Sequence, residues 1–263
     1  MLGAIIGDIV GSVYEHARPP IKTTVFDFFT ERSFFTDDTV LTCAVADAIL
    51  HNKDYGEMIQ QYGRNYPGRG YGGRFQRWLF TDPPMPYNSF GNGSAMRVSP
   101  VGFAFDTVED VLREAEKTAL PTHNHPEGIK GAQATALAVY MARTGSAKED
   151  IRGEISSRFG YDLQRTCDDI RPHYSFDVTC QGSVPEALIA FFDSTDFESA
   201  IRLAISLGGD ADTLACIAGG IAQAYYGEIP AGIKVKTLQR LPVVLQQVVE
   251  RFHAAYGINE LSA

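Results

Sequence analysis

Two short segments combine neighbouring acidic residues with threonine hydroxyls, and both stand just before apolar, helix-forming sequence. The first is Thr36-Asp37-Asp38-Thr39 and the second is Asp210-Ala211-Asp212-Thr213. Adjacent carboxylates repel each other, and burying them without a cation is costly. A divalent cation relieves both problems, because hard cations bind carboxylate and hydroxyl oxygens. The two segments therefore predict one site with two metal ions that serves hydrolytic chemistry.

Helix capping is the simpler explanation for such segments, because Asp and Thr are favoured N-cap residues. Capping accounts for one acid in each segment, but it does not account for two acids in both, each beside apolar sequence. The proposed ligands are all oxygen atoms, which favours magnesium or manganese over zinc. Two such ions side by side can orient substrate hydroxyl groups and activate a water molecule. We therefore interpret the two segments as metal ligands.

Helical patterns surround both segments and predict the elements that position them. The small-residue stretch after Asp212 can pack closely in the protein centre, so we expect the second pair of carboxylates at the inner end of a buried helix. Helices are predicted over residues 40–50, 108–119, 127–142, 149–158, 184–192, 197–207 and 212–226, with one or two more within 234–256. Only residues 23–29 and 174–178 favour strands. Without regular alternation of strands and helices, the predicted fold is all-α, an orthogonal helical bundle.

The longest irregular region runs from residue 65 to residue 100 and is rich in glycine and proline. Such a long loop inside a compact domain is usually functional or disordered. Disorder would leave large apolar side chains in water, which is costly. These side chains are Tyr71, Phe75, Trp78, Leu79, Phe80, Tyr87 and Phe90. The 263-residue chain shows no linker, so one domain over residues 1–263 is expected.

The composition is that of an ordinary soluble globular protein, with 44% hydrophobic and 21% charged residues. The formal charge of -9 argues against a general attraction to nucleic acid or to an anionic membrane. No apolar stretch reaches membrane-spanning length, and Asp8 interrupts the apolar N-terminal run, which argues against a signal peptide. Cys43 and Cys216 lie in apolar helical patterns and are expected to be buried thiols, which suits a cytoplasmic location.

Three other classes of protein share parts of this pattern. Isoprenoid synthases are all-α proteins with adjacent Asp residues, but Asp37-Asp38 lacks a third acid one helical turn on. Phosphohydrolases of the His-Asp type need a His-Asp dipeptide, which does not occur in this sequence. Asp210-Ala211-Asp212 has the spacing of a glycosyltransferase Asp-x-Asp motif, but that motif belongs with a nucleotide-binding α/β fold. None of the three classes accounts for both acidic segments.

The ordered set of motifs resembles the ADP-ribosylglycohydrolases, including the dinitrogenase reductase-activating glycohydrolases, over nearly the whole chain. In order, the motifs are Gly3-Ala4-Ile5-Ile6-Gly7-Asp8 with Glu15, Thr36-Asp37-Asp38-Thr39, Gly70-Tyr71-Gly72, Gly91-Asn92-Gly93-Ser94-Ala95-Met96-Arg97, Thr122-His123 and Gly208-Gly209-Asp210-Ala211-Asp212-Thr213. The resemblance implies an all-α fold with a centre of two Mg²⁺ or Mn²⁺ ions. The implied metal ligands are Thr36, Asp37, Asp38, Asp210, Asp212 and Thr213. Ala211 stands where many relatives carry Thr, which indicates a bacterial-type branch.

The substrate that the resemblance implies is an ADP-ribosyl group whose distal ribose hydroxyls meet the metal ions. Water would cleave the bond at the anomeric carbon and release ADP-ribose. In the family a glutamate lies on a loop over the metals, which makes Glu15 a candidate catalytic acid or base. Asp38 and Asp212 are the alternatives for holding the attacking water.

The glycine-rich loop at residues 89–93 can approach a diphosphate closely through backbone N–H groups and small side chains. An Asn-Gly cluster also forms plain turns, and an aromatic residue or a lone histidine is more often structural. The resemblance nevertheless places a histidine near the substrate and gives the loop a binding role. The candidate substrate contacts are Gly72, Ser89, Phe90, Gly91, Asn92, Gly93 and His123.

The main expectation is a cytoplasmic, metal-dependent hydrolase that removes ADP-ribose from a protein side chain or from a small ADP-ribosyl compound. A non-catalytic ADP-ribose-binding protein, for instance a toxin-immunity protein, is the alternative, although the intact ligand set argues against loss of catalysis. A hydrolase of another nucleotide or glycoside is a third hypothesis. Neither nucleic acid nor a membrane is an expected partner. The acceptor linkage, the choice of Mg²⁺ or Mn²⁺ and the oligomeric state stay open, with a monomer as the working expectation.

Overall fold

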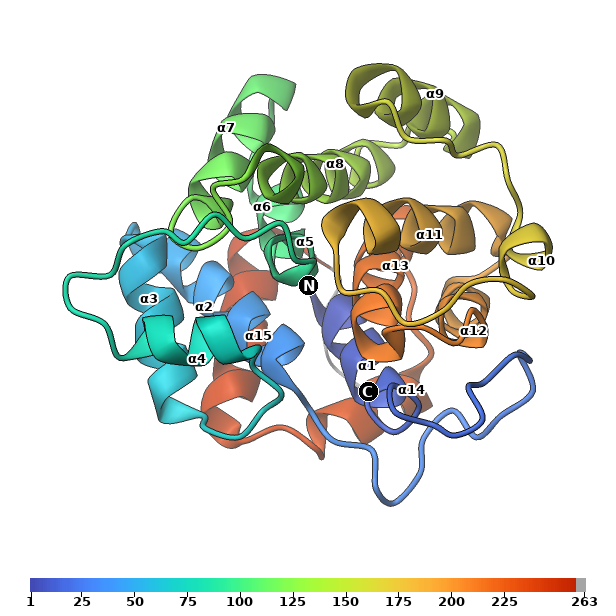
Figure 1. The fold of residues 1–263 in the computed structure, drawn as a ribbon, viewed down its shortest axis with the longest axis horizontal. Coiled ribbons are helices and arrows are strands. Elements are labelled where there is room, and N and C mark those ends of the chain that lie inside the picture. The colour runs from blue at the N-terminus through green and yellow to red at the C-terminus, as the bar shows by residue number, and fades with distance from the viewer. Residues whose placement is uncertain (259–263) are drawn as a thin grey trace.

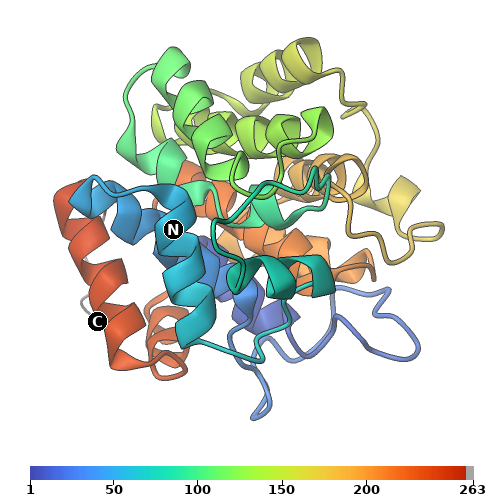
Figure 2. The ribbon, with the colours of Figure 1, turned by 60° about the vertical axis from the view of Figure 1, so that its left-hand side comes forward.

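The computed structural model describes residues 1–258, and this part of the chain contains fifteen helices and no β-strand (Figure 1). An isolated bridge between Gly91 and Thr179 is the one β contact among the described residues. The helices cross one another in several directions, which confirms the predicted all-α orthogonal bundle (Figures 1 and 2). They are α1 (Leu2–Gly11), α2 (Asp37–His51), α3 (Tyr55–Asn65), α4 (Gly73–Leu79), α5 (Gly93–Met96), α6 (Ser99–Ala104), α7 (Val108–Ala119), α8 (Pro126–Arg143), α9 (Lys148–Phe159), α10 (Cys167–Ile170), α11 (Cys180–Asp193), α12 (Phe197–Ser206), α13 (Ala211–Tyr226), α14 (Ala231–Leu238) and α15 (Val243–Ala255).

Helices α1 and α13 pack against each other at the centre of the fold, with α8, α11 and α12 against α13 (Figures 1 and 2). All ten residues of α1 are buried, as expected of a helix that is apolar on every side. A Cβ atom at Gly7 would lie 2.0 Å from the carbonyl oxygen of Ala215, and one at Gly11 would lie 2.5 Å from the Cα of Asp212. The missing side chains thus let the two backbones touch. This contact brings the end of α1 to the beginning of α13.

Both acidic segments lie at the N-terminal ends of buried helices. Thr36 is the N-cap of α2, and its hydroxyl accepts a hydrogen bond from the N–H of Asp38. Asp210 occupies the N-cap position of α13, and both it and Asp212 are buried. The expectation that the second segment sits at the inner end of a buried helix is therefore confirmed. Thr36 therefore caps helix α2, and the carboxylates near it also lie close to one another.

The helices predicted from periodicity all occur, with ends that differ by a few residues. Helices α1, α3 and α10 were not predicted, and the predicted strands at 23–29 and 174–178 are irregular. Three glycines in the ten residues of α1 lower its intrinsic helix propensity, and burial of the whole helix compensates. Neither β-prone segment forms a ladder in the described part of the chain, and the second leads only to the isolated bridge between Gly91 and Thr179.

The region from residue 65 to residue 100 is less irregular than predicted, because it contains α4, α5 and the beginning of α6. Its order agrees with the argument from its apolar side chains, since Tyr71, Phe75 and Trp78 are buried. Phe80 and Phe90 are exceptions and remain exposed. This segment packs over α3 and returns toward α5 and α8 (Figure 2). Residues of this segment line the cavity at the beginning of α2, which is described below.

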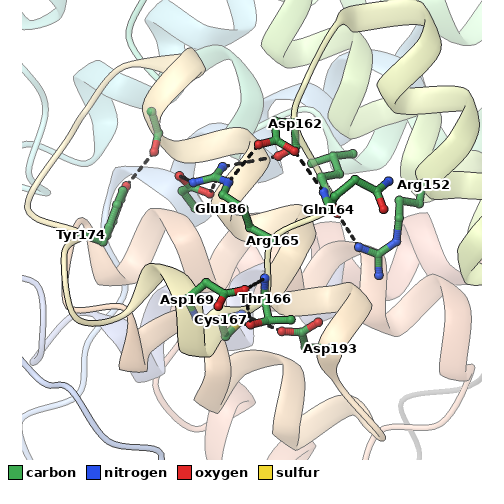
Figure 3. A network of polar contacts seen from close by, with 12 residues as sticks. Arg152, Asp162, Gln164, Arg165, Thr166, Cys167, Asp169, Tyr174, Glu186 and Asp193 are labelled. Atoms are coloured by element: carbon green, nitrogen blue, oxygen red, sulfur yellow. Dashed lines mark hydrogen bonds and ion pairs between the residues drawn. The ribbon is translucent and has the colours of Figure 1, made fainter.

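The connection between α9 and α11 is held by side chains that Figure 3 shows from close by. Both terminal nitrogens of Arg165 bind the carboxylate of Glu186, at 3.0 and 2.9 Å. The Tyr174 hydroxyl donates to the carbonyl of Gly182 at 2.8 Å. Two-pronged Arg–carboxylate pairs add geometric specificity to the ion pair. These contacts fix the loop that carries Val178 to the opening of the cavity described below.

Candidate active site

A cavity of about 610 Å³ opens where the N-terminal ends of α2 and α13 meet the loops around residues 70 and 90. It gathers nearly all the side chains and glycines predicted from the sequence. These are Glu15, Thr36, Asp37, Asp38, Gly72, Ser89, Gly91, Asn92, Gly93, His123, Asp210, Asp212 and Thr213. Phe90 is not part of the lining; it is 44% exposed, and its ring centroid lies 5.2 Å from that of His125. Phe90 is therefore the one candidate substrate contact that does not line this cavity.

Asp8 of α1 reaches the floor of this site and was missed as a site residue. Its Oδ1 accepts a hydrogen bond from Thr36 Oγ1 at 2.6 Å, and its Oδ2 accepts from the Thr36 and Thr39 N–H groups at 2.9 and 3.1 Å. The Thr39 hydroxyl also donates to Oδ2. Burial raises the pKa of Asp8 to about 6, and these donors oppose the shift. A lone acid in an otherwise apolar run was the signal that could have identified it.

Asp38 lies between the two threonines that were predicted as ligands. Its Oδ2 is 3.4 Å from Thr36 Oγ1 and 3.5 Å from Thr213 Oγ1. Its Oδ1 is buried and has no hydrogen-bond partner among the described residues. Burial raises the pKa of Asp38 well above its ordinary value, and the charges of Asp212 and Asp8 raise it further. A buried carboxylate oxygen without a donor is costly, so this atom is suited to bind a cation.

The second acidic segment lies beside Glu15 in the cavity. Asn92 Nδ2 donates to Asp210 Oδ2 at 2.7 Å, and the Thr213 N–H donates to Asp212 Oδ1 at 2.9 Å. Burial raises the pKa of Asp210 to about 6 and that of Asp212 well above its ordinary value. The pKa of Glu15 rises to about 7, mainly through burial and then through the charge of Asp212. Each carboxyl group is therefore easier to protonate than in water.

Asp37 lines the same cavity from its outer side. It is half-buried, and its N–H donates to the carbonyl of Arg69 at 2.7 Å. Burial raises the pKa of Asp37 well above its ordinary value, followed by the charges of Asp212 and Asp8. Asp37 does not belong to either of the tight carboxylate groups described next.

The carboxylates form two tight groups that share one member. Oxygen atoms of Asp8, Asp38 and Asp212 lie within 4.8 Å of one another, and so do oxygen atoms of Glu15, Asp210 and Asp212. In the described part of the chain, no Lys or Arg forms an ion pair with any of them. Buried carboxylates without cationic side chains repel one another, and divalent cations with oxygen ligands remove that repulsion. Together with the bare Asp38 Oδ1, this donor set fits divalent metal ions.

The glycine-rich loop lines the cavity next to the second acidic segment, because its Asn92 binds Asp210. The Asn92 N–H donates to the carbonyl of Val178 at 2.8 Å, which ties the loop to the segment before α11. A Cβ atom at Gly93 would lie 3.1 Å from Nε2 of His123, so the small residue leaves that nitrogen room at the cavity wall. Burial, and then the charge of Arg97, lower the pKa of His123 well below its ordinary value. His123 is consequently neutral at neutral pH.

Several lining residues were not singled out from the sequence. Arg97 and Tyr87 stand beside His123, Arg69 lies next to Asp37, and Arg74 also lines the cavity. The Arg97 side chain is fully buried, although arginine is usually exposed. All four cysteines are buried and free of disulfides, which confirms the prediction for Cys43 and Cys216. No described helix is both long enough and apolar enough to cross a membrane.

Comparison with known proteins places this geometry in a family. A family model described as ADP-ribosylglycohydrolase matches residues 1–260. The chain is 28% identical over 305 residues to ADP-ribosylhydrolase ARH3 of Homo sapiens, covering 86% of this chain and 84% of that protein. It is 28% identical over 304 residues to ADP-ribosylarginine hydrolase Tri1 of Pseudomonas putida (strain GB-1), covering 100% of this chain and 79% of that protein.

A solved structure agrees with the sequence relatives. It is described as an ADP-ribosylglycohydrolase-related protein complex and matches this fold with a TM-score of 0.74 and 26% identity. The match covers 98% of this chain and 95% of the solved chain. The family model, the relatives and the carboxylate-lined cavity agree over almost the whole length, and the chain therefore belongs to the ADP-ribosylglycohydrolases, a family of glycohydrolase enzymes.

Proposed function

We propose that this protein is a metal-dependent hydrolase that cleaves the glycosidic bond between ADP-ribose and an acceptor and releases ADP-ribose. The observation that carries the proposal is the pair of tight carboxylate groups joined at Asp212, with Asp38 Oδ1 buried and bare. Two ions, either Mg²⁺ or Mn²⁺, match the two groups and their oxygen donors. The names of the relatives, an ADP-ribosylhydrolase and an ADP-ribosylarginine hydrolase, support the substrate class.

The proposed metal ligands are the six residues predicted from the sequence, with Asp8 as their support. They are Thr36, Asp37, Asp38, Asp210, Asp212 and Thr213. Thr36 Oγ1 donates its proton to Asp8 Oδ1 and accepts from the Asp38 N–H, which leaves one lone pair of that hydroxyl available for a cation. In the second acidic segment, Asn92 donates a hydrogen bond to Asp210 Oδ2 and so orients that carboxylate. Partners behind metal ligands set ligand orientation, so Asp8 and Asn92 are positioning residues in this proposal.

Bound divalent ions would supply orientation of the ribose hydroxyls and activation of water in this site. The chain itself supplies three candidates for proton transfer, Glu15, Asp38 and Asp212. Glu15 has the position best suited to this work, because it lines the cavity, is only half-buried and has a pKa raised to about 7. A catalytic acid or base works best when its pKa lies near the working pH. Asp38 and Asp212 are more deeply buried and better placed to hold cations.

The rest of the cavity suits the remainder of an ADP-ribosyl group. The loop residues Ser89, Gly91 and Gly93 line the same cavity as the carboxylates, with His123 beside Gly93. We therefore place the distal ribose at the carboxylates and the diphosphate at this loop. The opening next to Glu15 is left for the acceptor, either a protein side chain or a small molecule.

The test is product release from a panel of arginine-linked, serine-linked and small-molecule ADP-ribosyl substrates, with Mg²⁺, Mn²⁺ or EDTA. We expect ADP-ribose from at least one substrate with metal and none with EDTA. Asp38→Ala and Asp212→Ala should lose metal binding and lower turnover by more than about 100-fold, the upper end of what losing support of a metal ligand costs. Asp150→Ala, at an exposed position on α9, is the matched control.

Two results would contradict the proposal. Turnover by metal-stripped Asp38→Ala/Asp212→Ala protein would exclude the metal-dependent mechanism. Tight ADP-ribose binding by calorimetry without release from any substrate would identify a non-catalytic binding protein instead.

A further inference from the structure

At the cavity wall, Arg97, Thr122 and His123 are joined by a continuous series of hydrogen bonds. Nη2 of Arg97 donates to the Thr118 carbonyl at 2.7 Å and to Thr122 Oγ1 at 2.9 Å. Thr122 Oγ1 in turn lies 2.7 Å from Nδ1 of His123. Arg97 and Thr122 are fully buried, and His123 is 5% exposed. Within the described residues Arg97 has no carboxylate partner, so its charge is not neutralised by an ion pair.

The direction of each hydrogen bond follows from the chemistry of the groups. A guanidinium group can only donate, so Thr122 Oγ1 must accept from Arg97. The Thr122 hydroxyl then has one proton to donate, and His123 Nδ1 is its remaining partner among the described residues. If Nδ1 carried a proton instead, the buried Thr122 hydroxyl would lose its acceptor, which costs free energy. The hydrogen bonds from Arg97 to Thr122 and from Thr122 to His123 both form only when Nδ1 accepts, so that Nε2 carries the imidazole proton.

The other ring nitrogen faces the cavity. His123 lines the cavity wall, and in the described part of the chain Nε2 has no hydrogen-bond partner. Cβ atoms at Gly93 and Gly91 would lie 3.1 and 3.6 Å from it. The glycines therefore keep the approach to Nε2 open on the side of the glycine-rich loop.

We infer that Arg97 and Thr122 are positioning residues that hold His123 as an Nε2–H donor aimed at the diphosphate of the ADP-ribosyl group. This inference rests on the proposed function, because it takes the diphosphate as the anion at the glycine-rich loop. His123 contributes a directed hydrogen bond to the anion, and Arg97 contributes a positive charge close to the imidazole ring. Two further donors of Arg97, Nε and Nη1, are buried and have no hydrogen-bond partner among the described residues. No neighbouring acceptor therefore offsets the charge of the guanidinium group at these two nitrogens.

The arrangement differs from an ordinary surface site for phosphate. A protonated histidine would place a second positive charge beside Arg97 in a buried position, which Coulomb repulsion disfavours. A neutral imidazole with a fixed tautomer avoids this repulsion and still offers one donor to the anion. Thr122 connects the two groups, because its hydroxyl accepts from the guanidinium and therefore donates to Nδ1 of the ring, which fixes the tautomer of His123.

The direct test is ¹⁵N NMR of the histidine side chains in the whole protein, without metal or ligand. His123→Gln assigns the His123 signals among the six histidines. In wild-type protein near pH 7 we expect a protonated Nε2 and an unprotonated Nδ1. Thr122→Val should change this pattern to a mixture of tautomers, whereas Thr122→Ser, which retains the hydroxyl, should preserve it. Thr135→Val is the matched control, since Thr135 is equally buried and its hydroxyl has no partner among the described residues.

Binding of ADP-ribose in the presence of Mg²⁺ provides the second readout. Thr122→Val should weaken the affinity about tenfold, the effect of about one hydrogen bond to a charged group. Thr122→Ser and Thr135→Val should stay within about twofold of wild type. An Nδ1–H tautomer in the wild-type protein would overturn the inference, and so would unchanged ADP-ribose affinity in Thr122→Val.

Failure of the proposed function looks different from failure of this inference. If the wild-type protein neither binds ADP-ribose nor releases it from any substrate, the proposed function and the diphosphate assignment both fall. The NMR result does not depend on ADP-ribose and decides the tautomer in either case.

Discussion

Asp8 in α1 and Thr36 at the beginning of α2 are joined by two hydrogen bonds, one at each oxygen of the Asp8 carboxylate. The Thr36 N–H lies 2.9 Å from Oδ2, and the Thr36 hydroxyl lies 2.6 Å from Oδ1. The central helix of the fold thereby holds the first acidic segment in place. It also decides which way the Thr36 hydroxyl points, and with it the geometry of the proposed metal centre.

Replacing Asp8 by Asn should weaken this link. The amide NH₂ of Asn would face either the Thr36 and Thr39 N–H groups, which can only donate, or the Thr36 hydroxyl, which would have to accept and turn its own proton elsewhere. A buried donor without an acceptor costs about 1–3 kcal/mol. We expect a loss of stability of that size and weaker binding of Mg²⁺ and Mn²⁺. Chemical denaturation and calorimetric metal titration measure the two effects. Asp150→Asn, on the exposed side of α9, should change neither. Metal affinity equal to wild type in Asp8→Asn would contradict a supporting role for Asp8.

The contact between α1 and α13 is predicted to tolerate no side chain at Gly7. An added Cβ would meet the Ala215 carbonyl oxygen at 2.0 Å, and backbone atoms cannot move aside as a side chain can. Gly7→Ala should cost about 3 kcal/mol or more, at or beyond the upper end of typical overpacking. Metal affinity should also fall, because Asp8 moves with the helix. The control is Gly153→Ala in α9, where an added Cβ meets nothing within 4 Å. It should stabilise the protein by about 0.5–1 kcal/mol. Equal melting temperatures for the two variants would refute this account of the helix pair.

Stability of the metal-free protein should depend on pH. The pKa values of Asp8 and Asp210 are raised to about 6 and that of Glu15 to about 7, mainly by burial. A carboxyl group with a raised pKa binds its proton more tightly when folded, so its contribution is full below about pH 4 and is lost as the pH rises through 6 to 7. In EDTA, the melting temperature should therefore fall between about pH 4 and pH 8.

Metal ions should reverse that loss, because they replace the protons that the carboxylates give up. Mg²⁺ or Mn²⁺ should raise the melting temperature more at pH 8 than at pH 5, where bound protons compete. Thermal denaturation across this range, with metal or EDTA, makes the comparison. A stabilisation by metal that is independent of pH would show that the buried carboxylates are not its binding site.

Asn92 should tune metal binding without being a ligand. Its side chain donates to Asp210 Oδ2 at 2.7 Å and to Ser183 Oγ at 3.0 Å, so it holds Asp210 from behind. Loss of such a partner typically lowers metal affinity about 10- to 100-fold, and we expect this range for Asn92→Ala. Asn65→Ala, at the exposed end of α3, should leave the affinity unchanged. An unchanged metal affinity in Asn92→Ala would remove Asn92 from the supporting set.

The sequence by itself determined the all-α class, most of the helices and the two acidic segments. These features are local, because amphipathic spacing, N-cap residues and neighbouring carboxylates are all read within a few residues. Helix α7, for example, occurs over residues 108–119 as predicted. The burial of the acidic segments was equally readable from the apolar sequence beside them, whereas the metal ions that they predict stay a prediction.

Tertiary structure alone decided which distant residues complete the site. Asn92 and Asp210 are 118 positions apart, and Asp8 and Thr36 are 28 apart, so no local pattern connects them. Helix α1 was overlooked because its glycines lower helix propensity, and those same glycines let it touch α13 and carry Asp8 to the carboxylates. Packing also left Phe90 outside the cavity and set Arg97 behind His123. Such placements depend on how whole helices fit together, which is a property of the folded chain and not of any short segment.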